Sequence, residues 1–304
     1  MKKIYQLLIV IGLLLIITFS GQAANDYPMR VTDDLNRELT IKDEPQRIVS
    51  LAPSVTEILY KLNLEDKIVG VTKFCNYPPQ AQSKTKISAK NVESIITQEP
   101  DLVIAAGIIS KKVIQRLHDL NIKIVGYQST SINETMNTIK QIAKISGRKN
   151  KGQKLTTQMR MELRKIKSKV EQQLKKEGER ATVFYEIWRQ PLRTVGSGTF
   201  INDLITTAGG KNIAASTQGN WPQYSLEQLL LKNPEVYIAT TGSWKDKVTA
   251  DKIKERPNYK QLQAVKNDRV YVFNADIINR PGPRLIKGLK LFVESIYPQI
   301  RLAD

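Results

Sequence analysis

A segment near the middle of this chain occurs twice, and the repeat limits what the chain can fold into. The copies span residues 91–105 and 225–239, and Glu93 matches Glu227 at a constant offset without a gap. Each copy predicts a short helix with a glutamate in its first turn, then a proline that ends the helix. The apolar run that follows, beside an acidic residue, is typical of a strand covered on both faces. The repeat therefore predicts two similar α/β lobes, each with one acidic residue at an equivalent place.

The amino terminus predicts export. Lys2 and Lys3 precede an apolar run at residues 7–17, and small residues follow at 20–24. This order is typical of a secretory signal peptide, so we expect residues 1–24 to be removed, with an uncleaved anchor as the alternative. No other run approaches the roughly 20 apolar residues of a membrane span, and no cysteine lies near the cleavage site. The sequence therefore predicts a periplasmic or cell-envelope protein with no transmembrane span in the mature chain and no lipid anchor.

Strands and helices alternate along the rest of the chain. A small hairpin is expected at residues 30–41, and a buried strand at 47–52 leads into a helix. Ser54 is the expected N-cap of that helix, with Glu57 as its capping-box partner. Alternating strands and helices form a mostly parallel sheet with helices on its faces.

One long helix is predicted in the middle of the chain. Residues 150–177 carry apolar side chains at spacings of three and four, which form a single helical stripe: Leu155, Met159, Leu163, Ile166, Val170 and Leu174. Such a helix is about 40 Å long and connects two lobes more stiffly than a Gly/Ser linker does.

The predicted fold class is therefore α/β, with two Rossmann-like lobes joined by one long rigid helix. Each lobe is expected to contain a mostly parallel sheet with helices on both faces. We place the N-terminal lobe at residues 25–148, the interlobe helix at 149–179 and the C-terminal lobe at 180–304.

The positive charge of the chain does not by itself predict a nucleic-acid partner. The formal net charge is +18, and twelve Lys/Arg face four Glu within residues 148–180. Such a field can attract nucleic acid or acidic lipids. Because these charges are interspersed on one predicted helix of an exported protein, we interpret them as a solvated face.

Residues for catalysis or metal binding are scarce. The chain has one histidine, His118, and one cysteine, Cys75, which we expect to be buried. The turn at Gly196-Ser197-Gly198 begins like a dinucleotide-binding motif, but the third glycine position is occupied by Ile201. No Gly-x-Ser-x-Gly motif accompanies the histidine. The sequence therefore predicts no catalytic residue, no metal site and no cofactor, which favours a binding protein over an enzyme.

Aromatic residues gather in predicted loops after strands, where open α/β sheets bind ligands. Phe74 and Tyr77 follow the second strand, Trp188 ends the first strand of the second lobe, and Trp221 precedes the second repeat copy. A single aromatic residue is more often part of a core. Clusters from both lobes predict a cleft for a large, flat, partly apolar ligand.

Several segments together resemble the periplasmic-binding family for cobalamin and iron-siderophore complexes, the receptors of ABC importers. They lie at residues 31–38, 47–59, 91–95, 221–227 and 280–284, so the resemblance covers essentially the whole mature chain. Within the family, residues 76–81 and 221–223 are most similar to the cobalamin branch. The loop at residues 87–90 is shorter than in cobalamin binders, which tend to have a Trp or Tyr there.

The resemblance implies a monomer that holds its ligand between the lobes with little hinge motion. It implies ligand contacts from Phe74, Tyr77, Trp188, Trp221 and Arg280, with Trp221 packing on a corrin ring and Trp188 able to supply the wall missing near residue 87.

The resemblance also implies a membrane partner, the ABC permease with its ATPase. Glu93 and Glu227 are similar to the carboxylates that dock onto arginines of the permease. The alternative role for each is a helix N-terminal charge, worth about 0.3–1 kcal/mol.

These features predict an exported substrate-binding protein that captures cobalamin or a related corrinoid. A ferric siderophore or haem receptor is the alternative within the family, because Arg189, Arg193 and Arg280 could face an anionic ligand. A metal-cofactor enzyme or scaffold on a similar fold is the alternative from another class. The single cysteine argues against it, because cluster ligation normally needs several thiolates.

Overall fold

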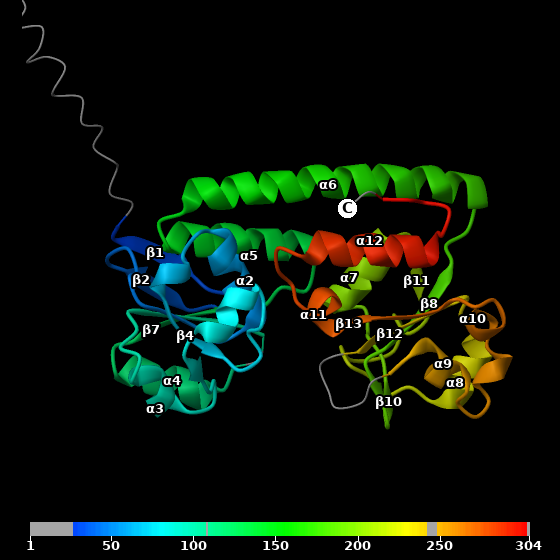
Figure 1. The fold of residues 1–304 in the computed structure, drawn as a ribbon, viewed down its shortest axis with the longest axis horizontal. Coiled ribbons are helices and arrows are strands. Elements are labelled where there is room, and N and C mark those ends of the chain that lie inside the picture. The colour runs from blue at the N-terminus through cyan, green and yellow to red at the C-terminus, as the bar shows by residue number, and fades with distance from the viewer. Residues whose placement is uncertain (1–26, 108, 242–247, 303–304) are drawn as a thin grey trace, which may run out of the picture.

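The computed structural model describes residues 27–107, 109–241 and 248–302, and the predicted signal peptide lies outside them. Figure 1 shows two lobes side by side, with one long helix running over both. This helix is α6 (Lys149–Glu177). The predicted fold class, two α/β lobes joined by one long helix, is confirmed.

The N-terminal lobe is built on a five-stranded parallel sheet in the order β5-β4-β3-β6-β7. Its strands are β3 (Ile48–Ser50), β4 (Ile68–Thr72), β5 (Lys86–Ile87), β6 (Leu102–Ala106) and β7 (Lys123–Tyr127). An antiparallel hairpin precedes the sheet and consists of β1 (Met29–Thr32) and β2 (Glu38–Ile41). The buried Asp33 in its turn ties this hairpin to β7 by accepting a 3.0 Å hydrogen bond from the Gly126 N–H.

The C-terminal lobe contains a four-stranded parallel sheet in the order β11-β8-β12-β13. Its strands are β8 (Thr182–Glu186), β11 (Lys211–Asn212), β12 (Val236–Thr241) and β13 (Val270–Asn274). A second small hairpin follows β8 and is formed by β9 (Trp188–Arg189) and β10 (Leu192–Arg193).

Helices cover both sheets. Those of the N-terminal lobe are α2 (Pro53–Lys61), α3 (Val92–Ile96), α4 (Lys111–Asp119) and α5 (Ile132–Ile145), with short 3-10 turns η1 (Glu65–Lys67) and η2 (Pro79–Ser83). Those of the C-terminal lobe are α7 (Phe200–Thr207), α8 (Leu226–Lys232), α9 (Ala250–Lys254), α10 (Gln263–Lys266), α11 (Ala275–Ile278) and α12 (Leu285–Ile296), with the 3-10 turn η3 (Tyr259–Gln261). None of the described helices combines the length and apolar character needed to cross a membrane.

The sequence repeat corresponds to a structural repeat. Asn91 caps α3 and Ser225 caps α8, each by accepting a hydrogen bond from the backbone N–H three residues further on. The residues just before the two prolines, Glu99 and Asn233, both adopt a positive φ, at 46° and 42°. Each copy then continues into a buried strand, β6 or β12. The chain therefore makes the same helix–turn–strand unit in both lobes.

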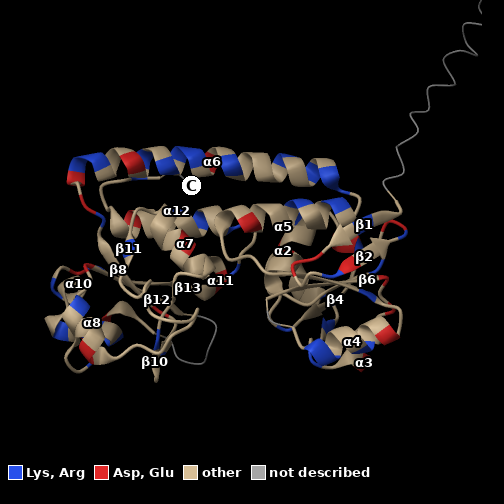
Figure 2. Cartoon of the chain, turned by 180° about the vertical axis from the view of Figure 1, so that it is seen from behind, with Lys and Arg blue, Asp and Glu red and all other residues tan. Residues whose placement is uncertain are grey.

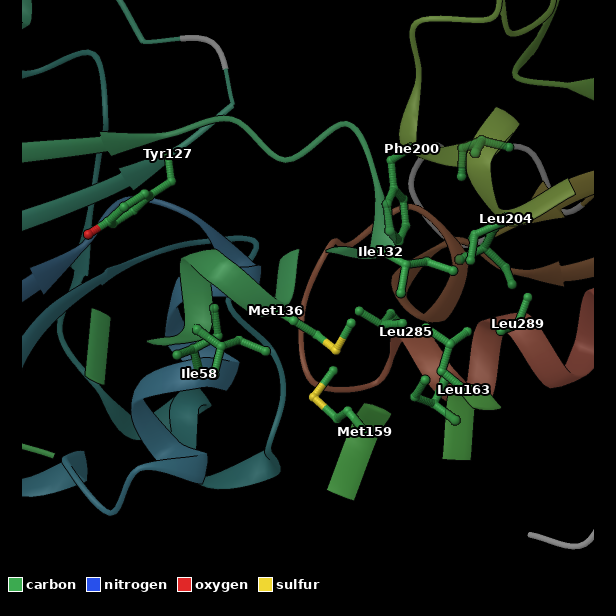
Figure 3. Packing of buried hydrophobic residues seen from close by; sticks show 14 of the residues in the cluster. Ile58, Tyr127, Ile132, Met136, Met159, Leu163, Phe200, Leu204, Leu285 and Leu289 are labelled. Atoms are coloured by element: carbon green, nitrogen blue, oxygen red, sulfur yellow. The ribbon is translucent and has the colours of Figure 1, made fainter. Parts of the chain in front are cut away.

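The apolar stripe of α6 joins the two lobes into one core. Met159 and Leu163 are buried at its middle, where they belong to the same hydrophobic cluster as Met136 of α5 and Leu285 of α12 (Figure 3). This cluster also includes Ile58 of α2 in the N-terminal lobe. Apolar packing beneath the helix therefore continues from one lobe to the other among the described residues.

The outer face of α6 is exposed and basic. Lysine and arginine residues occur along most of its length (Figure 2), and the Lys165 side chain is paired with Glu162 at 2.9 Å. The helix ends at Gly178, whose φ of 80° is a conformation that glycine adopts without strain.

Candidate functional site

A cavity of about 380 Å³ lies between the two lobes. Its described lining contains three side-chain amides, from Gln128, Asn220 and Asn279, several hydroxyls and an apolar wall. The wall is formed by Val55, Ile58, Ile187, Phe200 and Trp221. None of the described lining residues carries a charge. The cavity thus offers hydrogen bonds and apolar surface rather than ion pairs.

The topology places this cavity at the carboxyl ends of the parallel strands, where open α/β sheets bind ligands. Ala106 ends β6, Gln128 directly follows β7 and Ile187 directly follows β8. The first turns of α2 and α7 also face it, through Ser54 and Phe200. Residues far apart in sequence therefore converge on one space.

Two glycines explain how the Trp221 loop is held. A Cβ on Gly196 would lie 2.1 Å from the Gly219 carbonyl oxygen, and a Cβ on Gly198 would lie 2.5 Å from Asn220 Oδ1. The Gly196-Ser197-Gly198 motif is thus needed for the close approach of two loops. Arg193 Nη1 also donates a 3.0 Å hydrogen bond to the Trp221 carbonyl. The Trp221 ring, which is 46% exposed, projects from a fixed backbone.

Four charged side chains form a closed group beside the cavity. Glu57 of α2, which is 2% exposed, accepts hydrogen bonds from Arg284 Nε at 2.8 Å and Arg284 Nη2 at 2.6 Å. Its Oε1 also lies 3.2 Å from Arg280 Nη1. Arg280 Nη2 in turn lies 2.5 Å from Asp276 Oδ1. This charge cluster (Glu57, Asp276, Arg280 and Arg284) connects the N-terminal lobe to the C-terminal lobe.

The predicted capping role of Glu57 is wrong. The N-cap of α2 is Ala52, and no side chain caps this helix. The Glu57 carboxylate instead points across to the two arginines, because their guanidinium groups compensate its charge in a buried place. Sequence analysis missed both this role and Arg284. The available signal was an acidic residue beside the apolar Ile58 and Leu59, together with two arginines in the 280–284 segment.

The ligand-binding residues predicted from the sequence do not all lie together. Trp221 lines the interlobe cavity. Tyr77 lines a second cavity of about 460 Å³ together with Glu57 and Arg284 of the charge cluster, and the Arg284 guanidinium lies 3.9 Å from its ring centroid. Phe74 is 60% exposed, and its carbonyl accepts a 3.2 Å hydrogen bond from Arg280 Nη2. Trp188 lies on the β9–β10 hairpin, outside the lining of the interlobe cavity.

The two glutamates of the repeat are exposed and occupy equivalent places. Glu93 lies in the first turn of α3 and Glu227 in the first turn of α8. Both helices lie on the side of the molecule opposite α6, one on each lobe (Figures 1 and 2). Glu93 lines a surface cavity of about 740 Å³ together with Lys90, Lys112 and Arg116.

The protein environment shifts the pKa of two polar side chains near the cavity, Tyr185 and Arg284. Burial raises the pKa of Tyr185, whose hydroxyl donates a 2.6 Å hydrogen bond to Asn279 Oδ1 and so fixes an amide of the cavity wall. Burial acts to lower the pKa of Arg284, but the hydrogen bond and charge of Glu57 outweigh it and the pKa is raised. The tyrosine therefore stays neutral and the arginine stays charged across the physiological range.

The described residues contain no group of three His, Cys, Asp or Glu side chains that could hold a metal ion. His118 is on the surface, with its side chain 81% exposed, and Cys75 is buried as predicted. The arrangement of the cavity therefore fits ligand binding.

Comparison with known proteins agrees with this geometry. The profile of the family described as periplasmic binding protein matches residues 48–277, which include both sheets and the cavity. The chain belongs to this family. Members of it bind substrates for import and are not enzymes.

Three similar proteins cover most of this periplasmic binding protein. An uncharacterized ABC transporter substrate-binding lipoprotein of Bacillus subtilis, YvrC, is 35% identical, with 91% of this chain and 88% of the relative covered. The vitamin B12-binding protein of Vibrio parahaemolyticus is 32% identical, with 83% and 90% covered. The crystal structure of a possible iron-binding periplasmic solute-binding protein of Staphylococcus epidermidis is 33% identical, with a TM-score of 0.72 and 84% and 100% covered.

The first of these relatives corrects a prediction. We expected a protein without a lipid anchor, because no cysteine lies near the predicted cleavage site. A relative that matches along nearly the whole chain is named a lipoprotein, which contradicts this expectation. The expectation relied on the absence of a cysteine near the cleavage site. The structure does not describe residues 1–26.

Proposed function

We propose that this protein is the substrate-binding protein of an ABC importer that captures cobalamin or a related corrinoid in the interlobe cavity and delivers it to the permease. The observation that carries the proposal is the cavity lining, which combines amides, hydroxyls and a tryptophan ring with no charged side chain among the described residues. Binding would use burial and ring packing in a preformed cleft, with no chemical step.

The chemistry of a corrinoid matches this lining. Its ring is large and partly apolar, and its edge carries carboxamide groups that exchange hydrogen bonds with amides and hydroxyls. The Trp221 ring provides a face for packing, a contact worth about 0.5–1.5 kcal/mol beyond the area buried. The vitamin B12-binding relative supports the same ligand class.

A ferric siderophore is the second candidate, because one relative is named a possible iron-binding protein. An anionic iron complex is normally held by cationic side chains. Arg280 is already paired with Glu57 and Asp276, and Arg193 donates to the Trp221 carbonyl. These pairings favour the neutral corrinoid over the anionic complex.

Titration of the purified protein with cyanocobalamin, haemin and a ferric tris-catecholate, followed by tryptophan quenching, tests the proposal. We expect saturable, tight binding of cyanocobalamin and weaker binding of the two anionic ligands. Tight binding of either anionic ligand with no response to cyanocobalamin would overturn the corrinoid assignment. Because Trp221 lines the cavity, binding there should change its fluorescence directly.

Paired glutamates on the two lobes support delivery to a permease. Glu93 and Glu227 are exposed, sit at equivalent helix starts and share the side of the molecule opposite α6. A partner with two matching cationic sites could engage both lobes at once. The protein would act outside the membrane, in the cell envelope, as its export signal and relatives indicate.

A further inference from the structure

We propose that Glu57 determines the charge preference of the cleft, because it neutralises two arginines beside the ligand site and so keeps the cleft selective for a neutral ligand over an anionic one. The inference rests on the proposed function, because it requires that the interlobe cavity is the ligand site and that the ligand is neutral.

Residues next to the charge cluster in the chain line the interlobe cavity. Asn279 and Pro281, the neighbours of Arg280 in sequence, both line the cavity. On the opposite lobe, Ser54 lines it one helical turn before Glu57. The side chains of Arg280 and Arg284 remain 12% and 17% exposed, and Glu57 and Arg284 also line the second cavity beside Tyr77. Without compensating carboxylates, the two arginines would give the neighbouring cavity a positive potential that favours anionic ligands.

The cluster cancels these charges. Its two carboxylates and two guanidinium groups sum to zero, with Glu57 shared between Arg280 and Arg284. The contact to Arg284 is bidentate, through Nε and Nη2, which is the strong and directional form of this pair. Asn76 strengthens the closure, because its Nδ2 donates to Asp276 Oδ2 at 2.7 Å and its Oδ1 accepts from Arg280 Nη1 at 2.8 Å.

Stability alone does not explain the arrangement. Replacing a buried ion pair with well-packed apolar residues is often neutral or stabilising, because removing charges from water is unfavourable. Apolar packing already joins the lobes beneath α6. The charge-neutral cluster instead determines whether the neighbouring uncharged cavity binds neutral or anionic ligands.

The variant Glu57→Gln tests this role because it keeps the size of the side chain and removes one negative charge. The cluster would then carry a net charge of one positive unit beside the cavity. We expect the ratio of dissociation constants, trianionic ferric tris-catecholate over cyanocobalamin, to fall about tenfold relative to the native protein. The change should shrink as salt is raised from about 0.05 to about 0.5 M, because screening weakens it.

Two further variants make the test independent of stability. Arg284→Gln leaves the cluster with one negative unit and should shift the ratio in the opposite direction. Glu57→Gln with Arg284→Gln restores a sum of zero and should return the ratio to the native value. A purely structural role predicts something else, namely lower thermal midpoints with both ligands weakened together in every variant.

The outcomes separate the two proposals. A native protein that binds no cyanocobalamin overturns the proposed function. If the native protein binds cyanocobalamin but the single variants leave the ratio unchanged, or both shift it in the same direction, the inference about Glu57 is wrong and the proposed function stands. Should Glu57→Gln fail to fold, the comparison of Arg284→Gln with the double variant carries the same test.

Discussion

Trp221 presents an aromatic face to the cleft from a loop that hydrogen bonds hold in place. Removing the ring in Trp221→Ala should lower the affinity for cyanocobalamin about tenfold to a hundredfold, because packing area and ring contact are lost together. The loss can be measured by isothermal titration. Trp188→Ala is the informative comparison, because Trp188 lies outside the cavity lining. An equal loss in both variants would mean that the ligand extends over the β9–β10 hairpin.

The buried carboxyl of Asp33 makes the stability of the protein depend on pH. Burial acts to raise the pKa of this carboxyl, but hydrogen bonds from the Arg37 side chain and the Gly126 N–H, with the charge of Arg37, lower it overall. A carboxyl with a lowered folded pKa stabilises the protein above its unfolded pKa of about 3.9, and this contribution is lost as the pH falls through the folded pKa.

The variant Asp33→Asn should therefore lower the free energy of unfolding by about 1–3 kcal/mol at pH 7. Urea unfolding of the native protein and the variant, repeated from pH 7 to below pH 3, measures the difference. The gap should narrow in the acid range. A gap that stays constant with pH would show that packing, rather than ionisation, accounts for the loss.

Individual side-chain roles were only partly predictable from the sequence. Trp221 was found because aromatic residues gather in the predicted loops and because the segment at residues 221–227 resembles the family, and it lines the cavity. Glu57 was assigned to a capping box because Ser-x-x-Glu looks the same locally whether the glutamate turns back or reaches outward. Its partners, Arg280 and Arg284, are more than two hundred positions away in the chain. Only the folded arrangement of the lobes brings these charges together.

At the scale of elements, the contact between α5 and α6 depends on a missing side chain. A Cβ on Gly152 would lie 2.3 Å from Ala143 Cβ, which is too close for two carbon atoms. Gly152→Ala should lower the free energy of unfolding by about 1–3 kcal/mol, although alanine favours a helix more than glycine does. Thermal and urea unfolding measure the change.

A second substitution tests whether crowding is the cause. Ala143→Gly in the same chain removes the opposing Cβ and should recover most of the loss. Ser168→Ala, at an exposed position of α6, serves as the control and should change stability by less than about 0.5 kcal/mol. Failure of the double variant to recover would place the strain elsewhere in the helix pair.

Long, periodic elements were the most predictable. The apolar stripe at residues 150–177 indicated α6 to within a residue at its start. The two-residue strands β5, β9, β10 and β11 were not predicted. Segments this short carry no period of their own, so neighbouring strands rather than local sequence determine them.

At the scale of the molecule, Glu93 and Glu227 lie on separate lobes and on one side. The double variant Glu93→Ala with Glu227→Ala should bind cyanocobalamin like the native protein and lose most uptake in a reconstituted importer. Each helix N-terminus would lose only about 0.3–1 kcal/mol of stabilisation. Glu171→Ala, exposed on the basic face of α6, is the matched control and should retain uptake. Poor ligand binding by the double variant would contradict the docking role.

Three contacts between the lobes limit how far the lobes can move relative to each other. The core beneath α6 is continuous, the charge cluster joins the lobes beside the cavity, and Asp203 of α7 accepts a 2.7 Å hydrogen bond from the Ile132 N–H at the start of α5. Rotation about a hinge would have to break all three together. We therefore expect ligand-free and cyanocobalamin-bound crystal structures to superpose with a Cα difference of about 1 Å or less. A rotation that moved one lobe by several ångströms would show that these connections yield on binding, and that the cleft is assembled by its ligand.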